Sequence, residues 1–348
     1  MPLKIGIDAR GARFEFDCPA DEAILLAGLR AGIALPHECG TGSCGTCKAV
    51  IVDGDVDTGW DAAPGRKFLK AGTREILMCQ ARPRSACELQ VRGKTGPFEA
   101  GVPVPAHRTG RIAATSWLNT DVVQLEIVPD RPMPFLAGQF MLVQCPGVPG
   151  RRGWSMANAP GDGSRLVFTV KMMPGGSVSA WLRAHDRTGS PVQLFGPLGK
   201  AHLRPEDTDL VMIAGGSGLA PMLSLLAEGA RNRRFAQHRA HLFFGVRKAA
   251  DLYGVDDLVA IRAAYPGTVA ITVALSEEEP GPAAGQRYPG VLFASGFVHA
   301  VAGAALQGPV SGTTAFLAGP PPMVDAAMRM LIMEAKLPPN RIRYDKFV

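Results

Sequence analysis

The 348-residue sequence has no run of roughly 18 consecutive apolar residues, the length that a membrane-spanning helix needs. Its first residues, MPLKIGIDARG, lack the apolar stretch of a secretory signal. The basic residues occur singly or in pairs, with no run of five or more, although the formal net charge is +6. We therefore expect a soluble, cytoplasmic protein that binds neither nucleic acid nor a membrane.

Groups for acid–base or hydrolytic catalysis are also scarce. The seven histidines are isolated or loosely spaced, and no Ser–His–Asp set or paired acid and base stands out. With 47% apolar and 20% charged residues the composition is that of an ordinary globular protein, and the length predicts two or three domains. The chemistry must therefore be sought in the cysteines and in the glycine-rich motifs.

Three of the seven cysteines stand within nine residues, in the segment CGTGSCGTC at 39–47. They are Cys39, Cys44 and Cys47, and Cys79 follows after 31 intervening residues. In a reducing compartment such a cluster favours metal binding or redox chemistry over disulfides. Structural zinc usually takes two C-x2-C pairs, and only one is present. The spacing C-x4-C-x2-C with a distant fourth cysteine is the plant-type [2Fe–2S] pattern, so these four residues are the predicted metal ligands.

The glycines of this loop have a predicted role. Gly40, Gly42 and Gly45 allow positive φ angles, which turn backbone N–H groups toward the cluster sulfurs and stabilise the charge of the reduced cluster. The other three cysteines, at positions 18, 87 and 145, have no partner at ligand spacing and are expected to be small buried apolar residues.

The flanking sequence agrees with an iron–sulfur domain. Residues 3–16 alternate as a hairpin around Gly11, and residues 20–32 are predicted to form a helix closed by Gly32. With these features, residues 1–98 resemble the plant-type ferredoxins, which have a β-grasp fold. Residues 93–107 are rich in glycine and proline and lack periodicity, so we place a linker at 99–107.

The middle third, residues 108–205, is a series of short alternating segments that predicts an antiparallel β-barrel. Within it, RGWSMAN at 152–158 resembles the R-x-Y-S motif of the ferredoxin–NAD(P) reductase family, with Trp154 in place of tyrosine. The resemblance implies that Arg152 faces the FAD pyrophosphate. It also implies that Trp154 stacks on the flavin and that Ser155 hydrogen bonds near N5, which makes these two the catalytic candidates.

A second motif follows in this barrel. MMPGGSVSAWL carries the family's G-x-x-S at residues 176–179, where glycines before a helix form an anion site. FLAGQF and GPLG, at 135–140 and 196–199, also stand where that family has them. The FAD-binding candidates from this region are Lys171, Gly175, Gly176, Ser177 and Ser179.

The last third, residues 206–348, alternates strands and helices and predicts a Rossmann-like α/β domain. Its DLVMIAGGSGLAPM departs from a strict dinucleotide fingerprint but matches the GG[S/T]G-x-[A/T]P turn of the same family. FLAGPPPM matches the family's C-G-P-P-x-M, with Ala318 in place of the cysteine near the nicotinamide. By this resemblance the candidates for the nucleotide sites are Gly216, Ser217, Gly218, Pro221, Gly319, Pro320 and the near-terminal Phe347.

Residues 242–254 are expected to decide whether the protein prefers NADH or NADPH. Arg247 and Lys248 could bind a 2′-phosphate, whereas Asp251 would repel one and could hydrogen bond a 2′-hydroxyl. We expect NADH to be preferred. The alternative for Arg247 is that it lies at a solvated loop end and has no role in nucleotide binding.

The order of the three segments resembles the one-chain reductase components of bacterial multicomponent oxygenases. PHECGTGSCGTCK, AGGSGLAPM and the ending IRYDKF are similar to the reductases of toluene-type diiron monooxygenases and of carbazole dioxygenase. The resemblance implies a monomeric NADH-dependent oxidoreductase that uses FAD and a [2Fe–2S] cluster. Its acceptor would be an oxygenase, with a diiron monooxygenase favoured over a Rieske dioxygenase, or an intermediate Rieske-type ferredoxin.

One alternative is the reductase partner of a non-oxygenase system, such as a deoxysugar dehydratase. For the redox partner, we expect recognition by the exposed tip of the 39–47 loop and by Arg82 and Arg84, because residues 1–98 carry little net charge.

Overall fold

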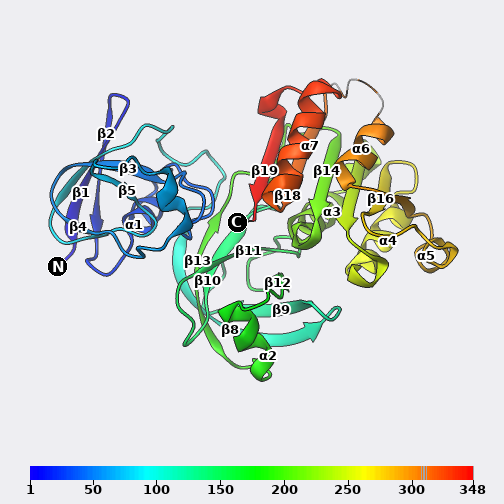
Figure 1. The fold of residues 1–348 in the computed structure, drawn as a ribbon, viewed down its shortest axis with the longest axis horizontal. Coiled ribbons are helices and arrows are strands. Elements are labelled where there is room, and N and C mark those ends of the chain that lie inside the picture. Colours follow the sequence, from blue (N-terminus) through cyan, green and yellow to red (C-terminus); the bar gives the residue numbers. More distant parts are fainter. Residues whose placement is uncertain (307, 309, 311, 348) are drawn as a thin grey trace.

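Three domains follow one another along the chain in the computed structural model, which describes residues 1–306, 308, 310 and 312–347. Figure 1 shows the N-terminal domain on the left, the middle domain below, and the C-terminal domain on the right. Each domain has a β-sheet of its own, of five, six and six strands respectively. The predicted fold class is confirmed.

The N-terminal domain packs a short helix against a mixed sheet in the order β2-β1-β7-β3-β5. Arg10 and Gly11, with φ of 50° and 87°, form the tight turn of the predicted hairpin between β1 and β2. The helix is buried along its length except at Arg30. The elements are β1 (Leu3–Ala9), β2 (Ala12–Cys18), α1 (Ile24–Arg30), β3 (Lys48–Asp53), β4 (Val56–Asp57), η1 (Pro64–Phe68), β5 (Glu75–Leu77), β6 (Arg82–Pro83) and β7 (Cys87–Gln90).

The middle domain is an antiparallel barrel in the order β11-β10-β13-β8-β9-β12. A bridge between Met156 and Phe168 joins the two ends of this order and closes the barrel, as the sequence predicts. The first strand begins at Ala106, inside the segment expected to be a linker. The elements are β8 (Ala106–Trp117), β9 (Val122–Pro129), β10 (Phe140–Gln144), β11 (Arg152–Ser155), β12 (Leu166–Lys171), α2 (Ser177–Ala184) and β13 (Pro191–Leu198).

The C-terminal domain has a parallel sheet in the order β17-β16-β15-β14-β18-β19. Strand order reverses on the two sides of β14, and ligands bind at the carboxyl ends of strands beside such a switch point. The strands are β14 (Leu210–Gly215), β15 (Ala240–Val246), β16 (Val269–Leu275), β17 (Leu292–Ser295), β18 (Thr314–Gly319) and β19 (Ile342–Lys346). The helices are η2 (Gly216–Gly218), α3 (Leu219–Arg231), η3 (Arg234–Ala236), η4 (Ala249–Asp251), α4 (Val255–Ala264), α5 (Pro282–Arg287), α6 (Val298–Leu306), α7 (Pro321–Met333) and η5 (Pro339–Arg341).

Apolar side chains of the barrel extend the cores of both neighbouring domains. Four barrel residues pack into the core of the N-terminal domain, namely Phe140, Leu142, Phe195 and Leu198. On the other side, Val122 and Ala137 join the C-terminal core, and the Ser224 hydroxyl of α3 donates to the Asn158 carbonyl at 2.7 Å. The barrel is therefore the platform that positions the two outer domains.

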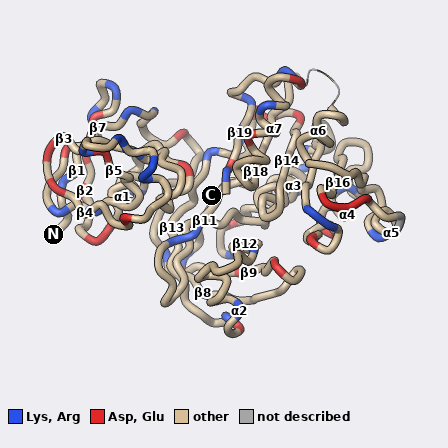
Figure 2. Tube along the Cα trace, in the orientation of Figure 1, with Lys and Arg blue, Asp and Glu red and all other residues tan. Residues whose placement is uncertain are grey.

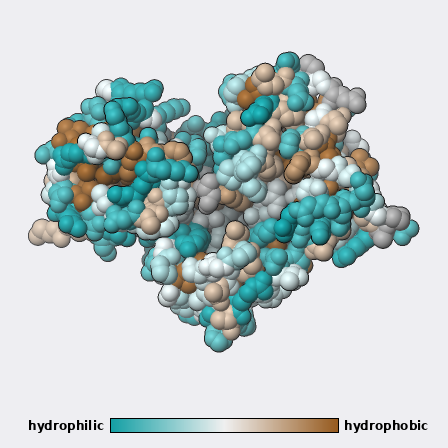
Figure 3. All heavy atoms as spheres, in the orientation of Figure 1, coloured by the Kyte–Doolittle hydropathy of each residue, from teal (hydrophilic) through white to brown (hydrophobic). Residues whose placement is uncertain are grey.

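The surface carries both signs of charge on every domain. Lys and Arg lie among Asp and Glu along the whole trace (Figure 2), in line with the scattered basic residues of the sequence. The space-filling view shows a notch between the N-terminal and C-terminal domains above the barrel (Figure 3). Within the part of the chain that the structure describes, no helix is both long enough and apolar enough to cross a bilayer.

Candidate functional site

The cysteine loop has the backbone that its glycines predict. Gly40, Gly42 and Gly45 have φ of 66°, 91° and 76°, a region that residues with side chains rarely adopt. As a result, the Thr41 and Cys44 N–H groups each donate to Cys39 Sγ at 3.4 Å. The Thr46 N–H donates likewise to Cys44 Sγ at 3.5 Å. The predicted positive φ angles, and the N–H groups turned toward the cysteine sulfurs, are confirmed.

The four predicted ligands come together as two pairs. Cys47 Sγ lies 3.2 Å from Cys79 Sγ, and a hydrogen bond from the Cys44 thiol, with others from Thr41 and the loop backbone, lowers the pKa of Cys39 to about 4. Among the described residues, no three His, Cys, Asp or Glu side chains are grouped as a site for a single ion. Two pairs suit two bridged irons, each completed by two thiolates, better than one tetrahedral zinc.

The other three cysteines are buried, as expected. Cys18, Cys87 and Cys145 lie in apolar cores, and burial raises the pKa of each thiol, to about 12 for Cys18 and about 11 for Cys145. A thiol with a raised pKa is a poor ligand and a poor nucleophile at neutral pH.

All three domains line one cavity of about 550 Å³. The cysteine loop contributes Cys39 and Thr41, and the barrel contributes Trp154, Ser155 and Thr169. The C-terminal domain contributes the turn after β14 and the end of β19, which Figure 1 shows reaching the junction of the domains. The cavity therefore connects the predicted cluster site to the predicted flavin site.

Two cationic features converge on one side of this cavity. Arg152 Nη2 lies 3.3 Å from Ser177 Oγ, at the N-terminus of α2. The unpaired N–H groups of that helix turn and the guanidinium both attract phosphate oxygens. Ser179 has a different role, because its hydroxyl accepts the Met173 N–H at 2.8 Å and shapes the turn before the helix. The G-x-x-S motif and Arg152 thus meet on one side of the cavity, in an arrangement suited to an anion.

Trp154 and Ser155 lie on β11 and line the same cavity. The indole is 8% exposed and packs on Phe168, with ring centroids 5.9 Å apart. Arg151, which precedes Arg152 in the sequence, does not line the cavity. Burial lowers the pKa of Arg151, with a further contribution from Arg82, because this side chain lies toward the N-terminal domain.

Sequence reasoning missed several polar groups of the cavity. Asp345, on β19, and Thr169, on β12, both line it, and among the described residues neither the Asp345 Oδ2 nor the Thr169 Oγ1 has a hydrogen-bond partner. Burial raises the pKa of Asp345 to about 7, with a smaller contribution from Glu38. Unpartnered buried polar atoms are expected where a bound group completes them. The IRYDKF ending was the only sequence signal for this strand.

A second cavity of about 250 Å³ lies at the carboxyl ends of the parallel strands. Arg247 and Asp251 line it, together with Gly216, Pro320 and Lys171, which also line the larger cavity. The two cavities therefore adjoin at the turn after β14. This is the crevice beside the switch point, where a dinucleotide is expected.

The remaining predicted residues divide into two groups. Ser217 and Phe347 line the larger cavity, whereas Gly175, Gly218, Pro221 and Gly319 line neither. Gly218 and Gly319 have a packing role instead. A Cβ at Gly218 would meet the Ala318 carbonyl, and a Cβ at Gly319 would lie 2.9 Å from the Gly215 carbonyl oxygen. Because glycine has no Cβ, the turns after β14 and β18 can pack together.

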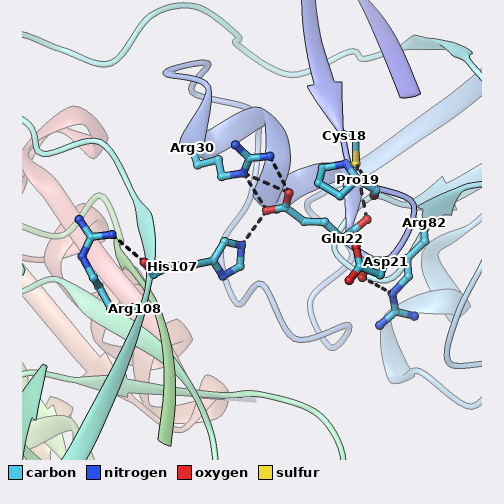
Figure 4. A network of polar contacts seen from close by, with 8 residues as sticks. All are labelled: Cys18, Pro19, Asp21, Glu22, Arg30, Arg82, His107 and Arg108. Atoms are coloured by element: carbon cyan, nitrogen blue, oxygen red, sulfur yellow. Dashed lines mark hydrogen bonds and ion pairs between the residues drawn. The ribbon is translucent and has the colours of Figure 1, made fainter. Parts of the chain in front are cut away.

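A polar network joins the N-terminal domain to the barrel (Figure 4). Glu22, just before α1, accepts hydrogen bonds from Arg30 at 2.9 Å and from His107 Nε2 at 2.7 Å. His107 belongs to β8, and its ring lies 4.6 Å from that of Phe195. The cysteine loop also packs on the barrel, because a Cβ at Gly40 would lie 3.1 Å from Leu142. The loop is thus held directly against the barrel.

Comparisons with known proteins agree with this geometry. Residues 7–84 match the family described as a 2Fe-2S iron-sulfur cluster binding domain. Residues 114–203 match the oxidoreductase FAD-binding domain, and residues 212–329 match the oxidoreductase NAD-binding domain.

Two relatives and one solved structure span nearly the whole chain. The ferredoxin–NAD(+) reductase component of the alkene monooxygenase system of Xanthobacter autotrophicus is 35% identical over 338 residues, which cover 96% of this chain and 98% of that protein. The chain belongs to the monooxygenase reductase components. The xylene/toluene monooxygenase electron transfer component of Pseudomonas putida is 33% identical, covering 95% of this chain and 90% of that protein.

Among solved structures, the ferredoxin reductase in carbazole 1,9a-dioxygenase superposes with a TM-score of 0.82 at 28% identity, covering 100% of this chain and 99% of that one. The resemblances drawn from the sequence are therefore confirmed. The protein is an oxidoreductase with a [2Fe–2S] cluster, FAD and a nicotinamide nucleotide as its cofactors.

Proposed function

We propose that the protein takes a hydride from NADH and delivers single electrons, through its [2Fe–2S] cluster, to the oxygenase component of a multicomponent oxygenase. The observation that carries this proposal is the shared cavity, in which Cys39 and Thr41 of the cluster loop line the same space as Trp154 and Ser155. An electron then has only a short distance to cross between the flavin site and the cluster site.

Each part of the larger cavity has a proposed role in holding FAD. Arg152 and the N-terminus of α2 bind the diphosphate, and Trp154 provides an apolar face for the ring. Ser155 and Thr169 offer hydroxyl groups toward the polar edge of the flavin, and Phe347 covers it from the C-terminal domain. Bound FAD would link a two-electron donor to a one-electron acceptor. It can accept a hydride from the nicotinamide nucleotide and pass the two electrons to the [2Fe–2S] cluster one at a time.

The smaller cavity is the proposed nicotinamide nucleotide site. Gly216 and Pro320 line both cavities, so a nucleotide held at the carboxyl ends of the strands can extend its nicotinamide into the flavin site. Lys171 lies on the same border and can pair with a phosphate of either nucleotide.

The charges around the smaller cavity favour NADH over NADPH. Arg247 Nε lies 3.8 Å from Asp251 Oδ2, so a carboxylate already accompanies this cation. Nearby, Glu278 Oε1 accepts the Ala249 N–H at 2.7 Å and adds a second negative charge to the same loop. A 2′-phosphate would be repelled there. Steady-state kcat/KM should be higher with NADH, and an Asp251→Ser, Glu278→Gln variant should lose part of that preference.

For the acceptor, a diiron monooxygenase is favoured over a Rieske dioxygenase, because the two relatives described above carry monooxygenase names. We further propose that the reductase acts as a monomer, with or without an intermediate Rieske-type ferredoxin. The reductase of a deoxysugar dehydratase remains the second candidate. Genes for oxygenase subunits beside this gene would favour the first, and a dehydratase gene would favour the second.

Anaerobic mixing with NADH tests the electron path itself. Flavin absorbance should bleach first, and the electron paramagnetic resonance signal of a reduced [2Fe–2S] cluster should follow. Flavin bleaching without a cluster signal in a protein that holds both cofactors would contradict the proposal.

A further inference from the structure

Two large aromatic side chains of the N-terminal domain are exposed to solvent on the segment that packs against the cluster loop. Trp60 and Phe68 are 50% and 47% exposed, although aromatic residues of this size are usually buried. Both belong to residues 60–74, which we call the aromatic–basic segment. Exposed apolar groups gathered beside a functional site often mark a surface that binds another protein.

This segment covers one side of the cluster loop. A Cβ at Gly45 would lie 2.6 Å from the Phe68 ring, and the Gly65 N–H donates to the Gly42 carbonyl at 2.8 Å. Thr46 is exposed on the loop itself, and Cys44 is half-buried. The cluster is therefore separated from solvent here by little more than the segment and the loop.

The segment also concentrates positive charge. Residues 66–74, RKFLKAGTR, hold four of the 13 basic residues of residues 1–98 and none of the 12 acidic ones. Outside residues 66–74, residues 1–98 hold nine basic and 12 acidic residues, a net charge of −3. The two nearest carboxylates are engaged: Asp61, within the segment, lies 3.5 Å from Arg66, and Glu75, just after it, accepts the Lys70 N–H. Lys67 and Lys70 are exposed, and the Lys67 ammonium lies 5.1 Å from the Phe68 ring centroid.

The opposite side of the loop is already occupied. Cys39 and Thr41 line the flavin cavity, and Gly40 packs against Leu142 of the barrel. Arg82, a candidate for partner recognition, takes part in the polar network beside the barrel, where its Nε donates to the Asp21 carbonyl at 3.0 Å (Figure 4). Among the described residues, the side of the loop at the aromatic–basic segment is thus left free of the barrel and open to a second redox protein.

We propose that the aromatic–basic segment and Thr46 form the docking surface for the electron acceptor of this reductase, and that the acceptor presents an acidic rim around an apolar patch. This rests on the proposed delivery of electrons from the cluster to an oxygenase component. Trp60 and Phe68 supply the desolvated centre, where aromatic residues contribute most to binding. Lys67 and Lys70 form the rim, where charge sets the association rate and the choice of partner.

The test uses two acceptors with the same haem and opposite surface charge, native cytochrome c, which is basic, and succinylated cytochrome c, which is acidic. With wild-type holoprotein and NADH, the acidic form should be reduced faster at low salt, and its rate should fall as salt rises. A Lys67→Glu, Lys70→Glu variant should reduce the acidic form about tenfold more slowly and the basic form faster. Its NADH-driven ferricyanide reduction should be unchanged.

The matched control is Arg82→Glu, Arg84→Glu, which makes the same change of net charge outside the aromatic–basic segment, on β6 and the residue that follows it. Its rates with both cytochromes should stay within about twofold of wild type. Equal effects of the two double variants would overturn the proposed surface, because they would reflect net charge alone. No effect of Lys67→Glu, Lys70→Glu would overturn it as well.

The apolar centre has a separate test. Phe68→Ala should slow reduction of the acidic cytochrome without changing its salt dependence, whereas Trp117→Ala, at an exposed tryptophan of the barrel, should not. A Phe68→Ala protein with wild-type rates would contradict the aromatic part of the surface. If wild type reduces ferricyanide but neither cytochrome, the proposed delivery of electrons from the cluster fails instead.

Discussion

His107 Nε2 lies 2.7 Å from Glu22 Oε1, so the first strand of the barrel is hydrogen bonded to the segment that begins α1 of the cluster domain. The Glu22 side chain is only 9% exposed and also holds Arg30. Burial alone would raise the pKa of Glu22, but the hydrogen bonds from His107 and Arg30 outweigh it and lower the pKa. The contact therefore stabilises the docked position of the cluster loop through an ionised carboxylate.

Glu22→Gln should destabilise the protein by roughly 1–3 kcal/mol near neutral pH, because it removes a largely buried charged acceptor from two partly exposed donors. A carboxyl with a lowered folded-state pKa contributes stability above its ordinary value of 4.5, and this contribution is lost as pH falls through the folded-state pKa. The loss of wild-type stability between neutral pH and about pH 3 should therefore be smaller in the variant. Urea unfolding across this range measures both effects. Asp21→Asn, at an exposed neighbouring carboxylate, is the control and should change neither.

Cys44→Ser should abolish the cluster, since Cys44 is one of the four proposed thiolate ligands. Flavin bleaching by NADH should survive, because the flavin and nicotinamide cavities are built mainly by the other two domains. Stopped-flow absorbance and electron paramagnetic resonance separate the two events. Cys145→Ser, at a buried barrel cysteine, should retain the cluster. A folded Cys44→Ser protein whose flavin is no longer reduced would show that the domains do not act as separate modules.

Trp154→Ala should weaken FAD binding and slow flavin reduction, because the ring would lose its apolar neighbour. Arg152→Ala should also release FAD on dialysis, through the lost pairing with the diphosphate. Arg151→Ala is the informative comparison, since its side chain lies toward the cluster domain and not in the cavity. Retention of full flavin by Arg152→Ala, with loss in Arg151→Ala, would reverse the assignment.

Ala318→Cys should change the rate of hydride transfer by less than about tenfold. Ala318 is 1% exposed within the core of the C-terminal domain and lines neither cavity, so the added sulfur would act through packing. Overpacking can destabilise the domain by about 1–3 kcal/mol. Thermal unfolding and stopped-flow reduction by NADH measure the two effects separately. A loss of a hundredfold or more in rate would mean that the nicotinamide pocket has been shaped around alanine.

Asp345→Asn should flatten the pH dependence of stability in FAD-depleted protein. The pKa of this carboxyl is raised by burial from 3.8 to about 7, so between these values the folded state keeps a proton that the unfolded state has lost. Wild-type stability therefore falls as pH rises through this window, and asparagine removes that contribution. Melting temperatures from pH 4 to 8 provide the measurement, with Asp325→Asn, at an exposed carboxylate, as the control. Parallel curves for wild type and Asp345→Asn would contradict a raised pKa.

Local chemistry determined the parts of this protein that the sequence predicts well. The spacing of the four cysteines, and glycines at positions that require positive φ, define the cluster loop without reference to distant residues. The closed barrel and the parallel sheet follow from the periodicity of their strands and from the family's motifs. The order of the three domains is the order of these local signals along the chain.

Only the tertiary structure decided how the three domains meet. The hydrogen bond between Glu22 and His107, 85 residues apart, and the position of Asp345 in the flavin cavity depend on contacts between domains. Such contacts leave no periodic trace in the sequence, because each partner has an ordinary local environment on its own strand or turn. The same holds for the exposed side of the cysteine loop beside Phe68. That side is left open once Gly40 packs on Leu142, and packing between domains alone determines which side of the loop it is.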